Sequence, residues 1–309
     1  MSDGMVVKQA GPLALVEDGG RFGVRHLGVT QGGAADWISF RWANWLLGNP
    51  LDSAALEIVM GGGLALEVER ATRLALAGAD LAATLDDAPL TPGTSFAVRP
   101  GQRLVFHQPR AGLRAYLAFP GGLTAPEVLG SRACTVRERL GGLNGDGQPL
   151  AVGDRLSWPG DAPAERRLPE GAAPRMPSAG CRLALVPGAQ IAHFSGASLY
   201  RTFNMAWRVD NRADRMGVRL SGPVLRCALR GMVSEGIPLG AVQVPADGQP
   251  IVLLNDRQTI GGYPRLGALT PSACASLAQC LPGTEVRLVA QGPDQAREAH
   301  LRQLAAWKP

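Results

Sequence analysis

The chain has 309 residues, of which 31 are Lys or Arg and 26 are Asp or Glu, so its formal net charge is +5. A chain of this length buries about three quarters of its unfolded surface and needs no metal or disulfide to stay folded. Its only lysines are Lys8 and Lys308, which excludes most lysine chemistry, including Schiff bases, phosphate-loop lysines and a biotin-bearing lysine. The basic residues are not interleaved with aromatic ones, so we expect no nucleic-acid partner.

The cysteines and histidines show no ligand pattern. The five cysteines are odd in number and scattered without paired-ligand spacing, which is typical of reduced thiols in a cytoplasmic protein. Four histidines share no metal-ligand spacing, so no metal site is expected. The N-terminal residues lack the features of a secretory signal, and no run of about twenty apolar residues occurs, so no membrane association is expected.

Short strands joined by many turns should dominate the fold. The chain contains 40 Gly and 24 Pro but only 5% aromatic residues, a composition that favours a mainly β structure. The clearest helix of the first half is predicted over residues 37–47. Asp36 is its expected N-cap, and Gly48-Asn49-Pro50 should end it.

Four fragments recur in the same order in both halves of the chain. Among them, Gly20-Arg21-Phe22-Gly23-Val24-Arg25 corresponds to Asp214-Arg215-Met216-Gly217-Val218-Arg219, and Leu56-Glu57-Ile58 to Ser234-Glu235-Gly236. This repetition predicts two related β domains. We place them at residues 1–158 and 181–309, joined by a Pro/Gly-rich linker over residues 159–180.

Two elements stand out in the second half. A short helix is expected over residues 196–204. Residues 241–244 and 251–254 are rich in Val, Ile and Leu and flank Pro245-Ala246-Asp247-Gly248, so they are predicted to form a β-hairpin.

Polar residues crowd the turn that follows this hairpin. Asn255-Asp256-Arg257-Gln258-Thr259 precede Gly261-Gly262-Tyr263-Pro264. Glycines allow the backbone to approach a ligand closely while the strand holds the polar groups rigidly. Arg257 is expected to pair with a substrate carboxylate or phosphate while Asp256 orients water or a substrate N–H; the alternative is an ion pair that closes a barrel end.

Three further residues are candidates for the same site. Tyr263 can donate its hydroxyl to an oxyanion or fill the end of a barrel. Arg215, next to Asp214 before a glycine, either helps to present backbone N–H groups to an anion or forms a salt bridge that fixes a turn. Glu235 either acts as a base or caps loop N–H groups.

The segments containing residues 18–23, 214–220 and 231–269 together resemble the family of the 5-oxoprolinase C subunits. This family is also called allophanate hydrolase subunit 2 or the biotin-dependent carboxyltransferase family, and the resemblance extends from about Val6 to about Leu288. It implies a cyclophilin-like β-barrel for each half. The chain departs from the family at Gly32-Gly33-Ala34-Ala35-Asp36, where a Ser-Gly-Ala-Met-Asp run is usual, so a direct role for that loop is in doubt.

The resemblance implies catalysis as one subunit of an ATP-dependent 5-oxoprolinase that opens the lactam of 5-oxoproline to glutamate together with subunits A and B. Under this hypothesis Arg257 holds the substrate carboxylate, and Thr259 and Arg215 also contribute to substrate binding. Gln243 or Gln258 then contacts the ring amide, Tyr263 supports the oxyanion, and Asp256 or Glu235 positions water. The cofactor is ATP at the complex, and the nucleotide-binding residues are unknown.

Two alternatives remain open at this stage. One is the carboxyltransferase component of a biotin-dependent urea or amide carboxylase, which would require biotin on a separate carrier. The other is a non-catalytic regulator paired with a kinase-inhibitor-like subunit.

Overall fold

A computed structural model of the chain describes residues 4–177, 180–229 and 232–307. It is mainly β and divides into two compact units. The first comprises Met1–Gly23 and Gly32–Met176, and the second comprises Val24–Gln31 and Pro177–Pro309. Residues 178 and 179 of the expected linker lie outside the described residues. None of the helices in the described part combines the length and apolar character needed to span a bilayer.

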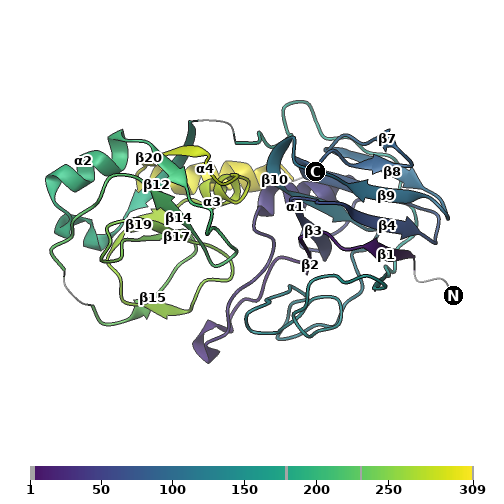
Figure 1. Cartoon of the computed structure of the whole chain (residues 1–309), viewed down its shortest axis with the longest axis horizontal. Coiled ribbons are helices and arrows are strands. Elements are labelled where there is room, and N and C mark those ends of the chain that lie inside the picture. Colours follow the sequence, from purple (N-terminus) through teal and green to yellow (C-terminus); the bar gives the residue numbers. More distant parts are fainter. Residues whose placement is uncertain (1–3, 178–179, 230–231, 308–309) are drawn as a thin grey trace. The chain divides into compact units, whose positions relative to one another are not determined.

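The first unit is built from two antiparallel sheets (Figure 1). Six strands pair in the order β11-β1-β4-β9-β6-β7, and five in the order β2-β3-β10-β5-β8. Their bounds are β1 Met5–Gln9, β2 Leu13–Glu17, β3 Ala55–Val59, β4 Leu64–Val68, β5 Thr72–Asp80, β6 Thr84–Leu85, β7 Ala88–Pro89, β8 Thr94–Val98, β9 Arg103–Phe106, β10 Ala111–Ala118 and β11 Arg155–Leu156.

One apolar core lies between these two sheets. Leu66 and Leu104 from the six-stranded sheet and Leu56, Leu76 and Leu117 from the five-stranded sheet belong to the same buried cluster. Apolar residues therefore line the facing sides of the two sheets, as is usual when sheets pack together.

Helix α1 (Trp37–Leu46) packs against the five-stranded sheet. Its N-cap is Asp36, whose Oδ1 accepts hydrogen bonds from the backbone N–H groups of Ile38 (3.2 Å) and Ser39 (3.1 Å). The expected cap is confirmed. The helix ends one residue earlier than expected, before Gly48 in the left-handed conformation (φ 69°), which favours glycine.

The segment expected as a linker is attached to the first unit as far as Met176. Ser95 of strand β8 binds Arg166 through three hydrogen bonds, two to its carbonyl oxygen and one from its N–H. Thr94 and Arg167 form an isolated β-bridge. An edge strand has unpaired backbone groups, so even a proline-rich segment can dock there.

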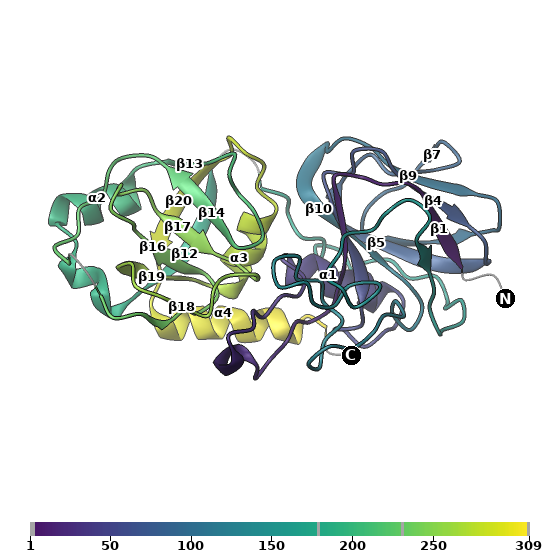
Figure 2. The same ribbon diagram turned by 60° about the horizontal axis from the view of Figure 1, so that its bottom comes forward.

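The second unit contains a closed barrel in the order β12-β19-β16-β17-β14-β13-β20, with a separate two-stranded β15-β18 ladder (Figure 2). The strands are β12 Cys181–Pro187, β13 Trp207–Val209, β14 Gly217–Ser221, β15 Glu235–Gly236, β16 Ala241–Gln243, β17 Ile251–Leu253, β18 Ile260–Gly261, β19 Arg265–Leu269 and β20 Glu285–Ala290. The helical elements are η1 Arg25–Leu27, η2 Ala189–His193, α2 Gly196–Asn204, α3 Pro271–Ala278 and α4 Pro293–Ala305.

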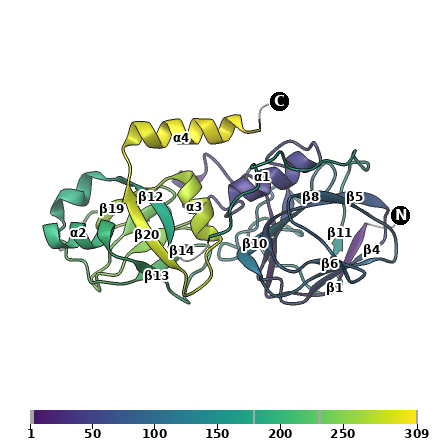
Figure 3. The same cartoon turned by 90° about the horizontal axis from the view of Figure 1, so that it is seen from above.

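Two expectations for this unit are confirmed. Strands β16 and β17 form an antiparallel hairpin in which Val242 lies opposite Val252 and Gln243 opposite Ile251. Helix α2 spans the expected residues, with Ser195 as its N-cap. Helix α4 follows β20 and runs outside the barrel wall (Figure 3). The buried cluster of this unit includes strand residues such as Leu183 and Val252 together with Leu277 of α3.

Candidate functional site

The candidate site begins where strand β17 ends. Beyond Leu253 the chain keeps pairing with the residues before β14. Leu254 N–H donates to Met216 O (2.9 Å) and Asp256 N–H to Arg215 O (3.0 Å). These backbone bonds hold the polar turn in place and bring Arg215 and Asp256 together across 41 residues of sequence.

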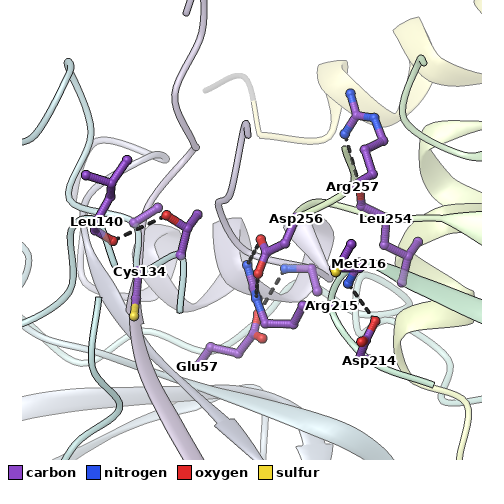
Figure 4. A network of polar contacts seen from close by, with 12 residues as sticks. Glu57, Cys134, Leu140, Asp214, Arg215, Met216, Leu254, Asp256 and Arg257 are labelled. Atoms are coloured by element: carbon purple, nitrogen blue, oxygen red, sulfur yellow. Dashed lines mark hydrogen bonds and ion pairs between the residues drawn. The ribbon is translucent and has the colours of Figure 1, made fainter. Parts of the chain in front are cut away.

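Asp256 and Arg215 form a buried, two-pronged ion pair (Figure 4). Arg215 Nε lies 2.9 Å from Asp256 Oδ2, and Nη2 lies 3.1 Å from Oδ1. Each residue is 6% exposed. This parallel arrangement is the strongest geometry available to an arginine and a carboxylate, and it corresponds to the ion-pair alternative for Asp256.

Arg257 is also buried, with only 3% of its surface exposed. Its Nε donates to Ile237 O (3.0 Å), its Nη1 to Leu254 O (3.2 Å) and its Nη2 to Gln31 Oε1 (3.4 Å). Burial lowers the pKa of Arg257 to about 10, and the nearby positive charge of Arg25 contributes to the decrease. All three nitrogens thus bind uncharged acceptors.

Arg25 approaches the same turn from the segment Val24–Gln31. Its Nη2 donates to the carbonyl oxygens of Ile237 (2.9 Å), Gln258 (3.2 Å) and Thr259 (2.9 Å). Burial lowers its pKa as well. The backbone carbonyls of Gln258 and Thr259 therefore bind an arginine that the sequence pattern did not place among the site residues.

A cleft of about 500 Å³ opens beside strand β15, and its lining includes Gln190, His193, Glu235, Pro238 and Arg265. Glu235 forms an ion pair with Arg265 and accepts a hydrogen bond from Gln190 Nε2 (3.1 Å). Gln190 Oε1 in turn accepts from the Arg265 N–H (2.8 Å). The Glu235 side chain is 47% exposed, so this carboxylate is both oriented and accessible, as a base or a water-positioning group must be.

Tyr263 belongs to a different cleft. It is 52% exposed and lines a depression of about 630 Å³ together with Cys227, Met232 and Val244. In the β15-β18 ladder Glu235 lies opposite Gly261, which is two residues before Tyr263. Even so, Glu235 lines the first cleft and Tyr263 lines the second.

Gln243 is 2% exposed on strand β16, opposite Arg265 on β19. Its side-chain nitrogen has no hydrogen-bond partner among the described residues. A Cβ atom on Gly261 would lie 3.1 Å from this nitrogen and 2.6 Å from Ile237 Cδ1. Glycine at position 261 therefore allows the β15-β18 ladder to lie directly against the amide.

The predicted residues do not form one site. They fall into the Asp256–Arg215 pair, the buried Arg257 beside the Gln258–Thr259 turn, and Glu235 in its cleft, while Tyr263 lines a second cleft and Gln243 is buried on β16. Arg25, Gln190 and Arg265 were missed. Arg25 ends a fragment that recurs in both halves of the sequence, which could have drawn attention to it. Gln190 carried no such signal. Within the described residues, no group of three or more His, Cys, Asp or Glu side chains could hold a metal ion.

Comparisons with known proteins agree with this architecture. The C subunit of 5-oxoprolinase from Escherichia coli (strain K12) is 37% identical over 292 residues, which cover 94% of this chain and 92% of that protein. The C subunit of 5-oxoprolinase from Haemophilus influenzae is 33% identical over 284 residues, covering 92% of this chain and 90% of that protein.

A solved structure extends the comparison. Urea amidolyase of K. lactis superposes with a TM-score of 0.93 at 26% identity, covering 99% of this chain but only 20% of that larger chain. Residues 27–290 match the family model described as carboxyltransferase domain, subdomain A and B. The chain therefore belongs to the family of carboxyltransferase domains composed of subdomains A and B.

Proposed function

We propose that this chain is the C subunit of an ATP-dependent 5-oxoprolinase, which opens the lactam of 5-oxoproline to glutamate together with subunits A and B. The observation that carries this proposal is the 37% identity to the Escherichia coli protein across 92% of that protein's length. Similarity over nearly the whole length of both proteins supports the inference that this chain occupies the same position in a multi-subunit complex as its relative. The chain contributes part of a hydrolase complex.

The reaction explains why several subunits and ATP are needed. The lactam of 5-oxoproline is an unreactive amide, and water attacks it readily only when its carbonyl oxygen is strongly polarised or made a leaving group. Phosphorylation of that oxygen by ATP would achieve this. The only lysines of the chain are Lys8 and Lys308, so it has no glycine-rich phosphate loop ending in lysine. We assign the nucleotide site to the partner subunits.

The cleft beside β15 is the best candidate for the contribution of this chain to the reaction. Its volume of about 500 Å³ suits a small molecule, and it contains the oriented, accessible carboxylate of Glu235. In this proposal Glu235 positions water or accepts a proton, and Arg265 and Gln190 hold Glu235 in place. Asp256 and Arg215 stabilise the turn that follows β17, without touching the substrate.

Reconstitution tests the function directly. Subunits A and B with ATP and 5-oxoproline should form glutamate only when this chain is added, and glutamate is measured by an enzyme-coupled assay. Full turnover without the chain, or by the chain alone, would contradict the proposal.

Substitution of Glu235 by Gln tests the role of the cleft. Because an amide cannot accept a proton, turnover should fall about 100-fold. The matched control is Glu298→Gln, which alters an exposed carboxylate on α4 paired with Arg302 and should leave turnover unchanged.

A second candidate function follows from the family and from the similarity to urea amidolyase. It is carboxyl transfer from carboxybiotin to urea or a related amide. The chain contains no Ala-Met-Lys-Met run for biotin attachment, so a separate carrier would supply the biotin. Incorporation of labelled bicarbonate into urea, with a biotin carboxylase and carrier present, would favour this function over lactam opening.

A further inference from the structure

Two arginine side chains in the second unit converge on one backbone oxygen. Arg25 Nη2 and Arg257 Nε both donate to the carbonyl oxygen of Ile237, at 2.9 Å and 3.0 Å. The two donor nitrogens share one acceptor, which holds the two guanidinium groups close together. Like charges held this close repel each other, and the repulsion is strong where water is largely excluded.

Neither arginine forms an ion pair with a carboxylate among the described residues. Their acceptors there are the carbonyl oxygens of Ile237, Leu254, Gln258 and Thr259 and the amide oxygen of Gln31. Asp256 is the acidic residue next to Arg257, but both of its oxygens already bind Arg215. The local charge of Arg25 and Arg257 is thus left without a neutralising partner of its own.

Two buried hydrogen-bond donors in the second unit have no acceptor within the described part of the chain. Arg25 Nη1 is buried and has no acceptor among the described residues, and the same is true of the side-chain nitrogen of Gln243. The Ile237 carbonyl oxygen binds Arg25, and the Ile237 side chain and the Gln243 amide both lie next to Gly261. Buried charges and buried donors are normally paired in folded proteins, so this arrangement calls for an acceptor that carries negative charge.

We infer that Arg25 and Arg257 form a binding site for an oxyanion, either a carboxylate or a phosphate group. Arg25 is only partly buried. A guanidinium supplies several N–H donors in a planar fork, which matches the oxygens of either group.

The inference deepens the proposed function and depends on it only for the identity of the anion. 5-Oxoproline carries a carboxylate, and ATP-dependent activation of its lactam produces a phosphate group. The Gly236 carbonyl, which binds Arg265 at the Glu235 cleft (3.0 Å), and the Ile237 carbonyl, which binds the arginine pair, belong to adjacent residues. An anion held here would therefore lie next to the residue that follows strand β15, which carries Glu235.

Isothermal titration calorimetry on the full-length chain tests the site with three probes: inorganic phosphate, 5-oxoproline, and 2-pyrrolidone, the same lactam without its carboxylate. Phosphate, 5-oxoproline or both should bind, and 2-pyrrolidone should not. Binding of 5-oxoproline alone identifies the group as a carboxylate, and binding of phosphate alone identifies it as a phosphate. If neither anion binds the wild-type chain at millimolar concentration, the inference is overturned.

Substitutions of Arg25 test whether the anion binds to the arginine pair. Arg25→Gln should weaken anion binding about 10- to 100-fold, because a charge-assisted hydrogen bond is lost, while Arg25→Lys should retain part of it. Arg182→Gln, which removes an exposed arginine from β12, should bind as the wild type does. Unchanged affinity in a folded Arg25→Gln variant would remove Arg25 from the site.

The outcomes separate this inference from the proposed function. Anion binding by the isolated chain without turnover in the reconstituted complex would leave the site standing and reject the 5-oxoprolinase role. Turnover in the complex combined with no anion binding would reject only the site.

Discussion

At the scale of single residues, matching positions of the two repeated halves have different surroundings. Glu57 is fully buried and accepts hydrogen bonds from the Ala35 N–H (2.9 Å) and the Tyr116 hydroxyl (2.7 Å). Burial and the charge of Glu57 raise the pKa of that tyrosine well above its usual value. Glu235, its counterpart in sequence, faces a cleft. A repeated motif therefore preserves a position, while the packing around it decides whether the carboxylate is structural or accessible.

The buried Asp256–Arg215 pair should be important for stability. Asp256→Asn removes the charge from the buried carboxylate that pairs with Arg215 through two hydrogen bonds, so the free energy of unfolding should fall by about 3 kcal/mol. Urea denaturation measures this change. Glu298→Gln, which breaks an exposed pair on α4, should cost less than about 0.5 kcal/mol. Equal losses in the two variants would show that the Asp256–Arg215 pair is solvated in solution.

Thiol reactivity should differ sharply between two cysteines of the barrel. Burial raises the pKa of Cys274 to about 12, whereas a hydrogen bond with the Cys280 thiol lowers the pKa of Cys181, which is only partly buried. The thiolate is the reactive form, so an alkylating reagent at pH 8 should label Cys181 before Cys274. Peptide mass spectrometry over time measures the order, and a Cys181→Ser variant should lose the early label.

At the scale of elements, α1 depends on its N-cap. Asp36 accepts two backbone N–H bonds and also the Ser39 hydroxyl (2.5 Å). Asp36→Ala should lower the free energy of unfolding by about 1 to 2 kcal/mol because these donors lose their acceptor. Asp36→Asn keeps one side-chain oxygen and should cost less. Thermal unfolding followed by circular dichroism compares the two, and equal losses would mean that charge, not capping, is what matters.

The elements that were predicted well share one property: their signals are local. Asp36 before an apolar helix, and the Pro245–Gly248 turn between two apolar runs, are each encoded within about fifteen residues. The docking of residues 166–168 on the β8 edge was missed because it depends on a strand about seventy residues earlier in the chain. Proline and charge content alone favoured a linker.

At the scale of the whole molecule, the second unit needs a distant piece of the chain. Val24–Gln31 belongs to it, and Arg25 and Gln31 bind the turn and Arg257 there. A fragment of residues 177–309 lacks these bonds, each worth about 1.5 to 3 kcal/mol where a charged donor is involved. Hydrogen exchange should therefore be faster at residues 254–261 in the fragment than in the full chain.

Helix α3 provides the internal reference for that experiment, because its N-cap is Thr270 and its hydrogen bonds are formed within residues 270–280. Its exchange should change less than that of residues 254–261. Equal protection of residues 254–261 in the fragment and in the full chain would show that Val24–Gln31 contributes nothing to the turn.

The sequence by itself determined the mainly β class, α1 with its cap, α2, the β16-β17 hairpin and the family. The helices and the hairpin are encoded by neighbouring residues, and the family is encoded by several motifs that occur in the family's order along the chain. It also identified the turn at residues 255–263 as the richest in polar groups. Only the tertiary structure decided the partners of those groups. Asp256 pairs with Arg215. Arg257 and Arg25, which are 232 residues apart in the sequence, donate to the same carbonyl oxygen, that of Ile237. Burial and pairing depend on which distant segments meet, and residue type and spacing do not encode that.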